Sequence, residues 1–179
     1  MMVSFFTNTY TISCQNGALP ETYQHAATHA QRIDRFMDEG GTPCFLSVAH
    51  GKNWPFLIVV QTYAPAGYGW YPGVLLIPET DILFFGAGER VLAYNLQTVQ
   101  QLWIDTADTG FYRWARHQDV VVMAAELELA AWTLEGQKLW SQFVEPPWDY
   151  DVENGRVLLD VMGITSTFDL RRGPEWKNT

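Results

Sequence analysis

One phrase recurs three times in the second half of the chain. It occupies residues 81–103, 119–140 and 156–176, which read DILFFGAGERVLAYNLQTVQQLW, DVVVMAAELELAAWTLEGQKLW and RVLLDVMGITSTFDLRRGPEW. Each copy contains a hydrophobic run, a turn, a segment that ends aromatic-x-Leu, a second turn and a tryptophan. This order predicts three short strands per copy. Several strands in a repeat of this length are typical of propeller blades.

Three kinds of residue mark equivalent positions in the copies. They are the aromatic residues Tyr94, Trp132 and Phe168, the leucines Leu96, Leu134 and Leu170, and the closing tryptophans Trp103, Trp140 and Trp176. The tryptophans lie 140 − 103 = 37 and 176 − 140 = 36 residues apart. Because one small twisted sheet cannot cover its own apolar face, we expect neighbouring sheets to stack, with the tryptophans as apolar contacts.

The segment before each copy also corresponds. GVLLIPET (73–80), GFYRWARHQ (110–118) and WDYDVENG (148–155) would each supply a strand that pairs with the start of the next copy. The first copy resembles the blade repeat of the quinoprotein-like (PQQ-type) β-propellers, and the likeness extends over about residues 73–176. The resemblance implies architecture and no specific chemistry, because neither the missing blades nor a calcium–cofactor site is recognisable. We therefore expect no cofactor.

The whole chain is expected to form one domain over residues 1–179, mainly β. An N-terminal part (1–41) would hold a strand at 2–13 and one α-helix from Glu21 to about Glu39, whose apolar residues recur at helical spacing. The rest (42–179) would form an antiparallel propeller-like meander of about three repeats, with a degenerate fourth in 42–72. The N-terminal strand could complete the last unit, or the repeats could form an open arc or sandwich.

Composition limits the class of partner. The chain has a formal net charge of −9 and a pI near 4.7, so nucleic acid and anionic membranes are not expected to bind it. No apolar run approaches the ~20 residues of a membrane span. The first residues lack the basic start of a signal peptide, and the two cysteines, Cys14 and Cys44, make no disulfide framework. We expect a cytoplasmic protein with reduced thiols.

Two aromatic-rich segments are the candidate partner-binding surfaces. APAGYGWYPG (64–73) carries Tyr68, Trp70 and Tyr71, and EPPWDY (145–150) carries Trp148 and Tyr150 beside carboxylates. Exposed aromatics of this kind are enriched at binding hot spots. The alternative is that both loops fold back and cover the edge of the meander.

An acidic segment is the candidate metal site. Asp149, Asp151 and Glu153 alternate, and Asp160 is the twelfth residue counted from Asp149, which partly matches a calcium loop. The glycine, Gly155, comes one position late for that loop. In a strand, alternate residues share a face, so the acids would instead face water while the residues between them pack inward.

Histidine and cysteine provide little for catalysis. His25 and His29 share a helical face at i and i+4, yet no third metal ligand is evident. Cys44 lies in an apolar strand context six residues before His50, where a cysteine is usually inert. His117 is expected in a turn. The chain has no G-x-S-x-G, CxxC or phosphate-binding glycine loop.

These features leave three hypotheses for function. The first is a non-catalytic protein that holds a basic protein partner through its acidic surface and aromatic loops. The second is a small-ligand module or hydrolase that takes a sugar or calcium, with Asp149, Asp151 and His117 as acids and base. The third is a structural module that self-associates. The sequence defines neither the oligomeric state nor whether the repeats close into a ring.

Overall fold

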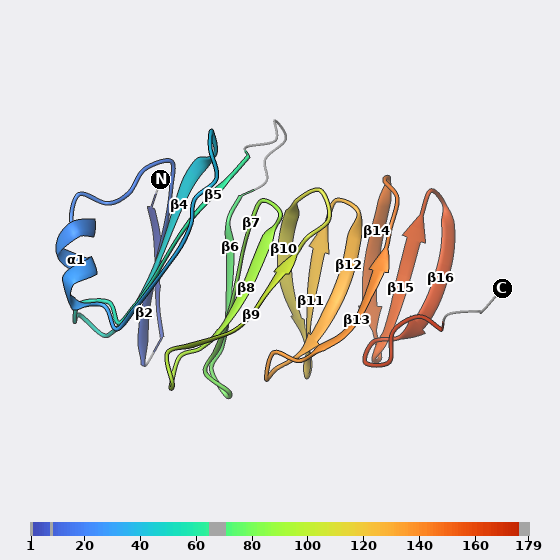
Figure 1. The fold of residues 1–179 in the computed structure, drawn as a ribbon. Helices are drawn as coiled ribbons and strands as arrows, with labels where there is room; N and C mark the ends of the chain where they lie inside the picture. Colours follow the sequence, from blue (N-terminus) through green and yellow to red (C-terminus); the bar gives the residue numbers. More distant parts are fainter. Residues whose placement is uncertain (1, 8, 65–70, 176–179) are drawn as a thin grey trace.

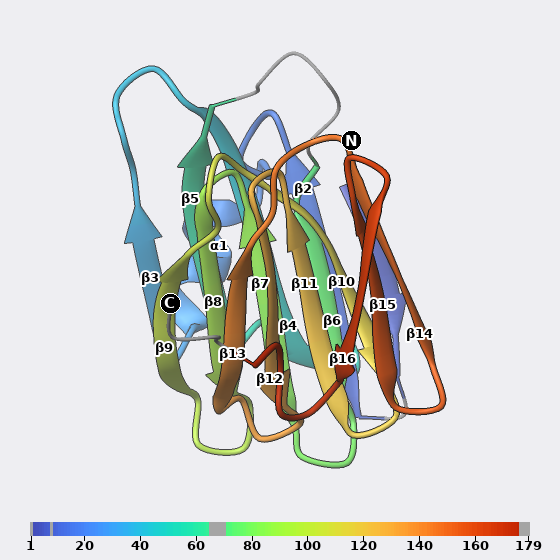
Figure 2. The ribbon, with the colours of Figure 1, turned by 90° about the vertical axis from the view of Figure 1, so that its right-hand side faces the viewer.

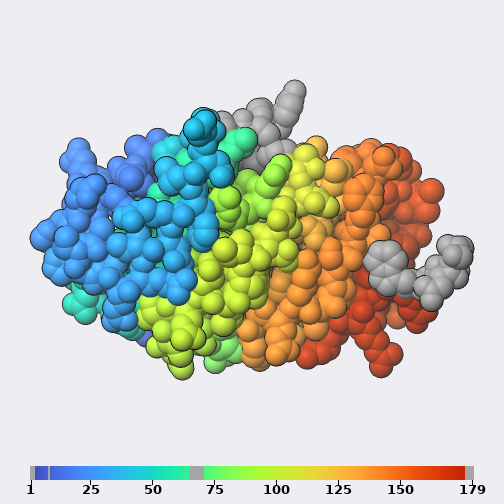
Figure 3. Space-filling view, in the orientation of Figure 1, coloured from blue at the N-terminus to red at the C-terminus, as the bar shows by residue number. Residues whose placement is uncertain are grey.

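Four β-sheets stand side by side in one row. The computed structural model describes residues 2–7, 9–64 and 71–175. The chain passes through the sheets in order from one end of the row to the other (Figure 1), and the space-filling view shows the same order along the long axis (Figure 3). The fold is mainly β and propeller-like, with one helix among the described residues.

The first sheet, called here the N-terminal sheet, has five strands. They are β1 (Met2–Phe6), β2 (Tyr10–Asn16), β3 (Arg32–Phe36), β4 (Thr42–His50) and β5 (Leu57–Tyr63). Their order across the sheet is β1-β2-β4-β5-β3, and only β3 and β5 run parallel. Helix α1 (Tyr23–His29) connects β2 to β3.

Each repeat of the sequence forms one further sheet, called a blade. Blade 1 contains β6 (Gly73–Ile77), β7 (Ile82–Ala87), β8 (Arg90–Asn95) and β9 (Gln100–Thr106). Blade 2 contains β10 (Phe111–His117), β11 (Val120–Ala125), β12 (Glu128–Thr133) and β13 (Lys138–Phe143). Blade 3 contains β14 (Trp148–Glu153), β15 (Arg156–Val161) and β16 (Ile164–Asp169).

Each strand of a blade pairs antiparallel with the next strand in the chain. The segments that precede the three repeats supply the first strands β6, β10 and β14, as the sequence predicts. Viewed along the row, these first strands lie on one side and β9 and β13 lie on the other (Figure 2). Antiparallel pairs need only short connections, which is consistent with the turn-like segments between the hydrophobic runs.

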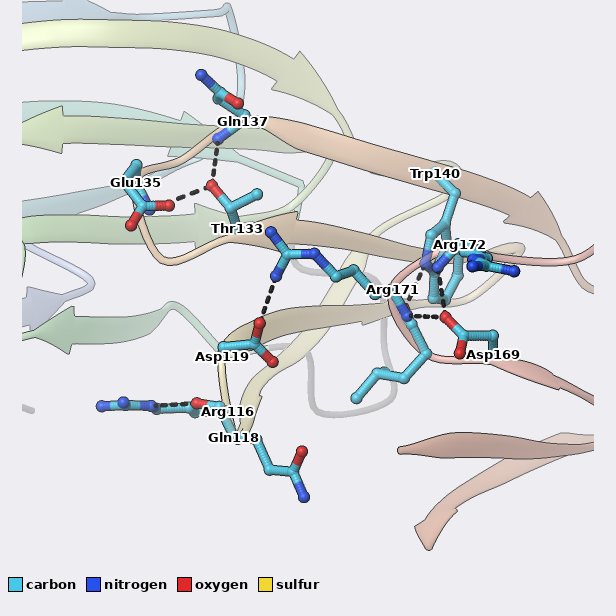
Figure 4. Close-up of polar contacts among 11 residues, drawn as sticks. Arg116, Gln118, Asp119, Thr133, Glu135, Gln137, Trp140, Asp169, Arg171 and Arg172 are labelled. Atoms are coloured by element: carbon cyan, nitrogen blue, oxygen red, sulfur yellow. Dashed lines mark hydrogen bonds and ion pairs between the residues drawn. The ribbon is translucent and has the colours of Figure 1, made fainter. Parts of the chain in front are cut away.

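A polar side chain closes the same turn in each blade. Asn95 Oδ1 accepts a hydrogen bond from the amide of Thr98 at 3.0 Å. Thr133 Oγ1 accepts the amides of Glu135 and Gln137, and Asp169 Oδ1 accepts those of Arg171 and Arg172 (Figure 4). Side chains of this type commonly stabilise turns by capping the backbone. The three blades therefore share a side-chain cap in this turn as well as the apolar positions of the repeat.

Apolar cores lie between neighbouring sheets. One core joins the N-terminal sheet to blade 1, a second joins blades 1 and 2, and a third joins blades 2 and 3. The largest fully buried side chains include Trp132, Tyr94 and Phe84. The aromatic positions of the repeat, Tyr94, Trp132 and Phe168, are all buried, which agrees with the stacking expected from the sequence.

The closing tryptophans bind the next blade. Trp103 on β9 donates its indole N–H to the carbonyl oxygen of Gly136 in blade 2 at 2.6 Å. Trp140 on β13 donates to the carbonyl oxygen of Leu170 in blade 3 at 2.7 Å (Figure 4). Trp176, the third closing tryptophan, lies outside the described residues. In both contacts a closing tryptophan donates to a backbone carbonyl of the next blade, although the acceptor lies 33 residues after Trp103 and 30 residues after Trp140. This type of contact is called the indole latch.

The helix is shorter than the sequence suggests. A helix to Glu39 was expected, but α1 ends at His29 and the next residues form the edge strand β3. The reason is a long-range partner, because β3 pairs with β5. Along β3, Ile33 packs toward the helix side and Phe36 packs into the core shared with blade 1, a strand alternation that overrides the helical spacing.

The N-terminal strands do not complete the last blade. The expected strand at 2–13 is a hairpin of β1 and β2, and β2 pairs with β4 in the N-terminal sheet. Strands β4 and β5, which the sequence assigns to the repeat region, belong to the same sheet. Within the described ranges, blade 3 therefore has three strands, and the outer edge of β16 has no partner beyond one bridge between Asp169 and Gly173.

The two ends of the row are finished differently. At the N-terminal end, Tyr23 and Ala26 of α1 cover Phe45, Ile58 and Val60 of the sheet. At the other end, the outer face of blade 3 is exposed to solvent and mostly polar; it is called the end face. Its residues are Asp149, Asp151, Glu153, Arg156, Leu158, Asp160, Thr165, Thr167 and Asp169. Repeat proteins commonly end in such caps, because an uncapped blade would expose its apolar face.

Candidate functional site

A pocket opens between the N-terminal sheet and blade 1. It has a volume of about 400 Å³. Its walls are residues 38–41 before β4, the end of β5 with Ala64, the β7–β8 turn at 87–90, the end of β9 at 104–106, and Thr109. It is called the rim pocket. Its size is within the range of small-ligand clefts, which is roughly 300–1,000 Å³.

Carboxylates dominate the rim pocket. Asp38, Glu39, Glu89 and Asp105 line it, and Arg90 is the one cation among the lining residues. Arg90 Nη2 lies 3.1 Å from Asp38 Oδ2, and its guanidinium sits over the ring of Phe36 at 5.2 Å. The Phe36 ring and the Asp38 carboxylate together hold Arg90 against the pocket wall. Its positive charge therefore compensates Asp38 and not the other carboxylates of the pocket.

The other three acids of the pocket differ in whether a cation lies beside them. Lys138 of blade 2 lies 2.8 Å from Asp105 Oδ2, which neutralises that carboxylate locally. Glu39 and Glu89 are exposed, and no ion-pair partner for either occurs in the part of the chain that the structure describes. The rim pocket thus keeps two uncompensated negative charges, which favour a cationic group.

The pocket is held by local hydrogen bonds. Thr62 Oγ1 accepts the amide of Asp38 at 2.6 Å, which ties the β3–β4 connection to β5. The amide of Ala107 donates to the carbonyl oxygen of Glu89 at 2.8 Å, which ties the end of β9 to the β7–β8 turn. Strand ends and turns that are fixed in this way place charged side chains on a rigid scaffold.

The first aromatic segment starts at this pocket. Ala64, the first residue of the segment, lines the pocket, and Tyr71, the next residue that the structure describes, is 65% exposed. Tyr68 and Trp70 lie outside the described residues. The structure therefore places one end of the aromatic segment at the rim pocket and leaves Tyr71 accessible.

The second aromatic segment has a different position. Trp148 and Tyr150 are half-buried, pack against the core between blades 2 and 3, and stack on each other with ring centroids 6.3 Å apart. The Trp148 indole N–H donates to the carbonyl oxygen of Glu126 at 2.8 Å. Both side chains thus take part in blade packing, in another interface from the rim pocket.

Two of the residues proposed above as acids and base of a small-ligand site, Asp149 and His117, lie near the Tyr150 ring, together with Arg113. Arg113 on β10 lies 4.0 Å from Asp149 and 5.4 Å from the centre of the Tyr150 ring, and the His117 ring is 6.0 Å from the same ring. His117 belongs to β10 itself, at its end, and not to a turn. Burial lowers the pKa of His117, Arg113 lowers it further, and Asp151 opposes both. Burial likewise raises the pKa of Tyr150.

The alternating acids all lie on the end face. Asp149, Asp151 and Glu153 are exposed while Trp148, Tyr150 and Val152 point inward, so the strand alternation is confirmed. Asp160 is directly opposite Asp149 on β15, and its Oδ1 accepts the amide of Gly163. Within residues 2–7, 9–64 and 71–175, no three His, Cys, Asp or Glu side chains are grouped closely enough to hold a metal ion.

The other reactive side chains are separated or packed away. The rings of His25 and His29 on α1 lie 4.8 Å apart, and the Trp54 ring contacts both, at 4.5 and 5.1 Å. His50 stacks on Phe56 at 4.6 Å, and Cys44 is fully buried in the core of the N-terminal sheet. In the described ranges α1 is too short to cross a membrane.

The sequence does not reveal the rim pocket. Its acids belong to three separate connections or strand ends, and their meeting depends on how the N-terminal sheet docks on blade 1. The only signal in the sequence is that turns 38–41 and 87–90 are both charged and glycine-containing. Such turns are common at any surface, so the signal becomes specific only with the fold.

Comparison with known proteins gives fold-level similarity alone. No protein-family model and no curated protein sequence matches the chain. Similar solved structures include Sqt1 from Saccharomyces cerevisiae (TM-score 0.45, 11% identity, 94% of this chain and 59% of that one) and HIRA(644–1017) (0.45, 7%, 90% and 46%). BamB from Moraxella catarrhalis is another (0.40, 12%, 77% and 51%).

These three solved structures are of the β-propeller type. The chain spans 46–59% of their length, so it covers about half of each. At such low identity and overall similarity, the description of the fold depends on the sheets themselves, namely their strand order, their repeat and the indole latch.

Proposed function

We propose that the protein is a non-catalytic binding module that holds a basic protein partner at the rim pocket. The observation that carries the proposal is the pair of uncompensated carboxylates, Glu39 and Glu89, in a pocket of about 400 Å³ whose other acids already have cations. A lysine or arginine side chain inserted there would meet both charges. The net charge of −9 would also steer a basic partner toward the surface.

The aromatic segment that starts at Ala64 would supply the apolar part of the contact. Tyr71 is exposed, and Tyr68 and Trp70 precede it in the chain. Aromatic side chains beside a charged centre are common anchors of protein interfaces. Trp148 and Tyr150 would contribute less, because their packing between blades 2 and 3 already uses much of their surface.

Comparative capture from the source cells tests the proposal. The experiment compares the tagged wild-type chain with two variants, Glu39→Gln/Glu89→Gln in the rim pocket and Asp149→Asn/Asp151→Asn on the end face. Each variant removes two negative charges. We expect a stoichiometric partner that binds the wild type and the end-face variant, and that is lost from the pocket variant and at high salt. Retention by the pocket variant, or no capture at all, contradicts the proposal.

A second variant tests the aromatic part. Tyr71→Ala removes an exposed ring without touching a core, whereas Trp148→Ala would also break the hydrogen bond to Glu126 and disturb blade packing. We expect Tyr71→Ala to weaken capture while its unfolding midpoint stays that of the wild type. Unchanged capture would show that the Tyr71 ring does not contribute and that the partner contacts only the charged residues.

A small-ligand module is the second candidate. The favouring observation is that Arg113, His117 and Asp149 lie around the Tyr150 ring, and that His117 Nε2 is buried with no hydrogen-bond partner among the described residues. A thermal shift on adding calcium or simple sugars, lost in His117→Ala, would support it. Equal melting curves across the panel contradict it.

The resemblance to the quinoprotein-type repeat would suggest an evolutionary origin for the blades, but it implies no activity. The repeat pattern in blade 1 would then mark descent from a blade of that family. Self-association by end-to-end stacking is less favoured than partner binding, because α1 covers one end of the row and the polar end face closes the other.

A further inference from the structure

The two cysteines of the chain lie next to each other in the N-terminal sheet. Cys14 is on β2 and Cys44 is on the neighbouring strand β4, and their Sγ atoms are 3.8 Å apart. Cys14 is half-buried, whereas Cys44 is fully buried. Two thiols in contact, one half-buried and the other fully buried, allow an oxidised cysteine to meet a resolving partner.

The strand register explains the contact. Cys14 lies opposite Leu46, and Cys44 lies opposite Asn16, so the cysteines are diagonal neighbours on one face of the sheet. Diagonal neighbours are roughly 7–8 Å apart, while a disulfide joins Cα atoms at about 4.4–6.8 Å. Because β2 and β4 are already paired, closing a bond needs β2 to slide along β4, or the backbone to distort locally, by about 1 Å at this point. Outside β2 the sheet has only the edge strand β1, so a shift of this hairpin breaks no strand pairing on its outer side.

We propose that Cys14 and Cys44 form a two-thiol oxidation site that reacts with hydroperoxides and closes to an intramolecular disulfide. The Cys14 sulfur attacks one oxygen of the peroxide, the O–O bond breaks, and a sulfenic acid remains on Cys14. The Cys44 sulfur then attacks the Cys14 sulfur, the S–O bond breaks, and water leaves with the Cys44 proton. Two thiols lose two electrons, and hydrogen peroxide is reduced to two water molecules.

The order of reaction follows from exposure and hydrogen bonding. Cys14 is the less buried of the two cysteines, and the hydrogen bond that it receives from Cys44 lowers its pKa, although burial acts in the opposite direction. The same contact and burial raise the pKa of Cys44, which keeps it protonated as the donor. The thiolate is the nucleophile in such chemistry, so Cys14 reacts first and Cys44 resolves.

The bond would fasten β2 to β4 beside the rim pocket. Asn16, two residues after Cys14, accepts a hydrogen bond from the Tyr63 hydroxyl at 2.7 Å, and Tyr63 lines the pocket. The disulfide would close a loop of 44 − 14 = 30 residues that includes α1 and β3. Constraining such a loop restricts the unfolded chain, so we expect a higher thermal midpoint for the oxidised protein.

The test exposes the reduced full-length chain to hydrogen peroxide, with glutathione in a parallel tube to show that the oxidant is active. We expect both thiols to disappear together, the intact mass to fall by two hydrogen atoms, and a peptide map to show Cys14 joined to Cys44. Dithiothreitol should restore both thiols. If both thiols persist while glutathione is consumed, or if the chain forms only intermolecular disulfides, the proposal is wrong.

Two variants separate the roles of the sulfurs. Cys44→Ala should stop at the sulfenic acid of Cys14, which a cyclic dione labels, and Cys14→Ser should leave Cys44 unreacted. Reaction of Cys44 in the Cys14→Ser variant contradicts the assigned order. Circular dichroism checks that each variant is folded, and the peptide map of the wild type decides the proposal even if one variant is not.

Discussion

The indole N–H of Trp103 donates to the carbonyl oxygen of Gly136, 33 residues later, at a distance of 2.6 Å. The same ring stacks on Trp132 with centroids 5.4 Å apart and an interplanar angle of 18°. One side chain of blade 1 thus makes a directional and an apolar contact with blade 2. Trp140 repeats the directional contact with blade 3, so the latch sets the position of each blade on its neighbour.

Removing one latch should destabilise the protein measurably. Trp103→Phe keeps an aromatic ring but loses the indole donor, and we expect a loss of about 1–2 kcal/mol in the free energy of unfolding. Urea denaturation followed by circular dichroism measures it. Trp54→Phe is the control, because Trp54 is 45% exposed on a hairpin, and it should change stability by less than about 0.5 kcal/mol. Equal losses in both variants would contradict a role for the latch.

Gly173 and Gly163 separate steric contact from backbone strain. Both have positive φ, 78° and 82°, but a Cβ on Gly173 would lie 2.5 Å from Trp140 Cγ, whereas a Cβ on Gly163 meets nothing within 4 Å. Alanine at either position carries the cost of left-handed backbone. We expect Gly173→Ala to cost about 1–3 kcal/mol more than Gly163→Ala, because it pushes the latch ring aside. Paired urea titrations give the difference directly.

Tyr94 should give the protein a pH-dependent stability in the alkaline range. The Tyr94 hydroxyl donates to Asp34 Oδ2 at 2.8 Å, and burial and Asp34 raise its pKa in the folded state. The unfolded chain loses this proton near pH ~10, so the contribution is complete below that pH and is lost as the pH rises above it.

The matched variant for this effect is Tyr94→Phe. At neutral pH it should cost about 1–2 kcal/mol, because Asp34 loses a buried hydrogen bond but keeps its ion pair with Arg32 at 2.7 Å. Its stability should fall less steeply than that of the wild type above pH ~10. Identical pH profiles for the two proteins would show that Tyr94 is not responsible.

The open edge of β16 should govern solubility. Ile164, at the start of β16, is 76% exposed, and within the described residues the outer edge of β16 pairs only through one bridge, so this edge is a template for pairing with other chains. Ile164→Lys should leave the unfolding free energy within about 0.5 kcal/mol and reduce aggregation on heating. Thr167→Lys, on the opposite face of the strand, is the control for added charge. Light scattering distinguishes the two, and equal protection by both would assign the effect to charge alone.

The blades were predictable because their determinants are local and repeated. Tyr94, Trp132 and Phe168 recur at nearly constant spacing, and each lies where the copies predict, buried between sheets. Alternation on β14 was equally readable, since the acids and aromatics occupy opposite faces. Because three segments share one pattern, the strands and buried positions expected for one copy are also expected for the other two.

The N-terminal sheet was not predictable in the same way. Ala26, Ile33 and Met37 keep helical spacing, but Ile33 belongs to a strand whose partner, Leu57–Gln61, comes 25 residues later. The rim pocket depends on this same docking, and its acids give no periodic signal. Local propensity is a weak guide wherever a distant strand supplies the hydrogen bonds.

The capped ends and the repeated latch together determine where this chain can lengthen. A blade added outside α1 or against the end face would meet a helix or a charged surface. A duplicated copy of residues 107–144, inserted between blades 2 and 3, would instead receive an indole from one neighbour and offer its own to the other. Internal duplication would therefore keep both outer surfaces of the row and add one new interface, between two copies of blade 2.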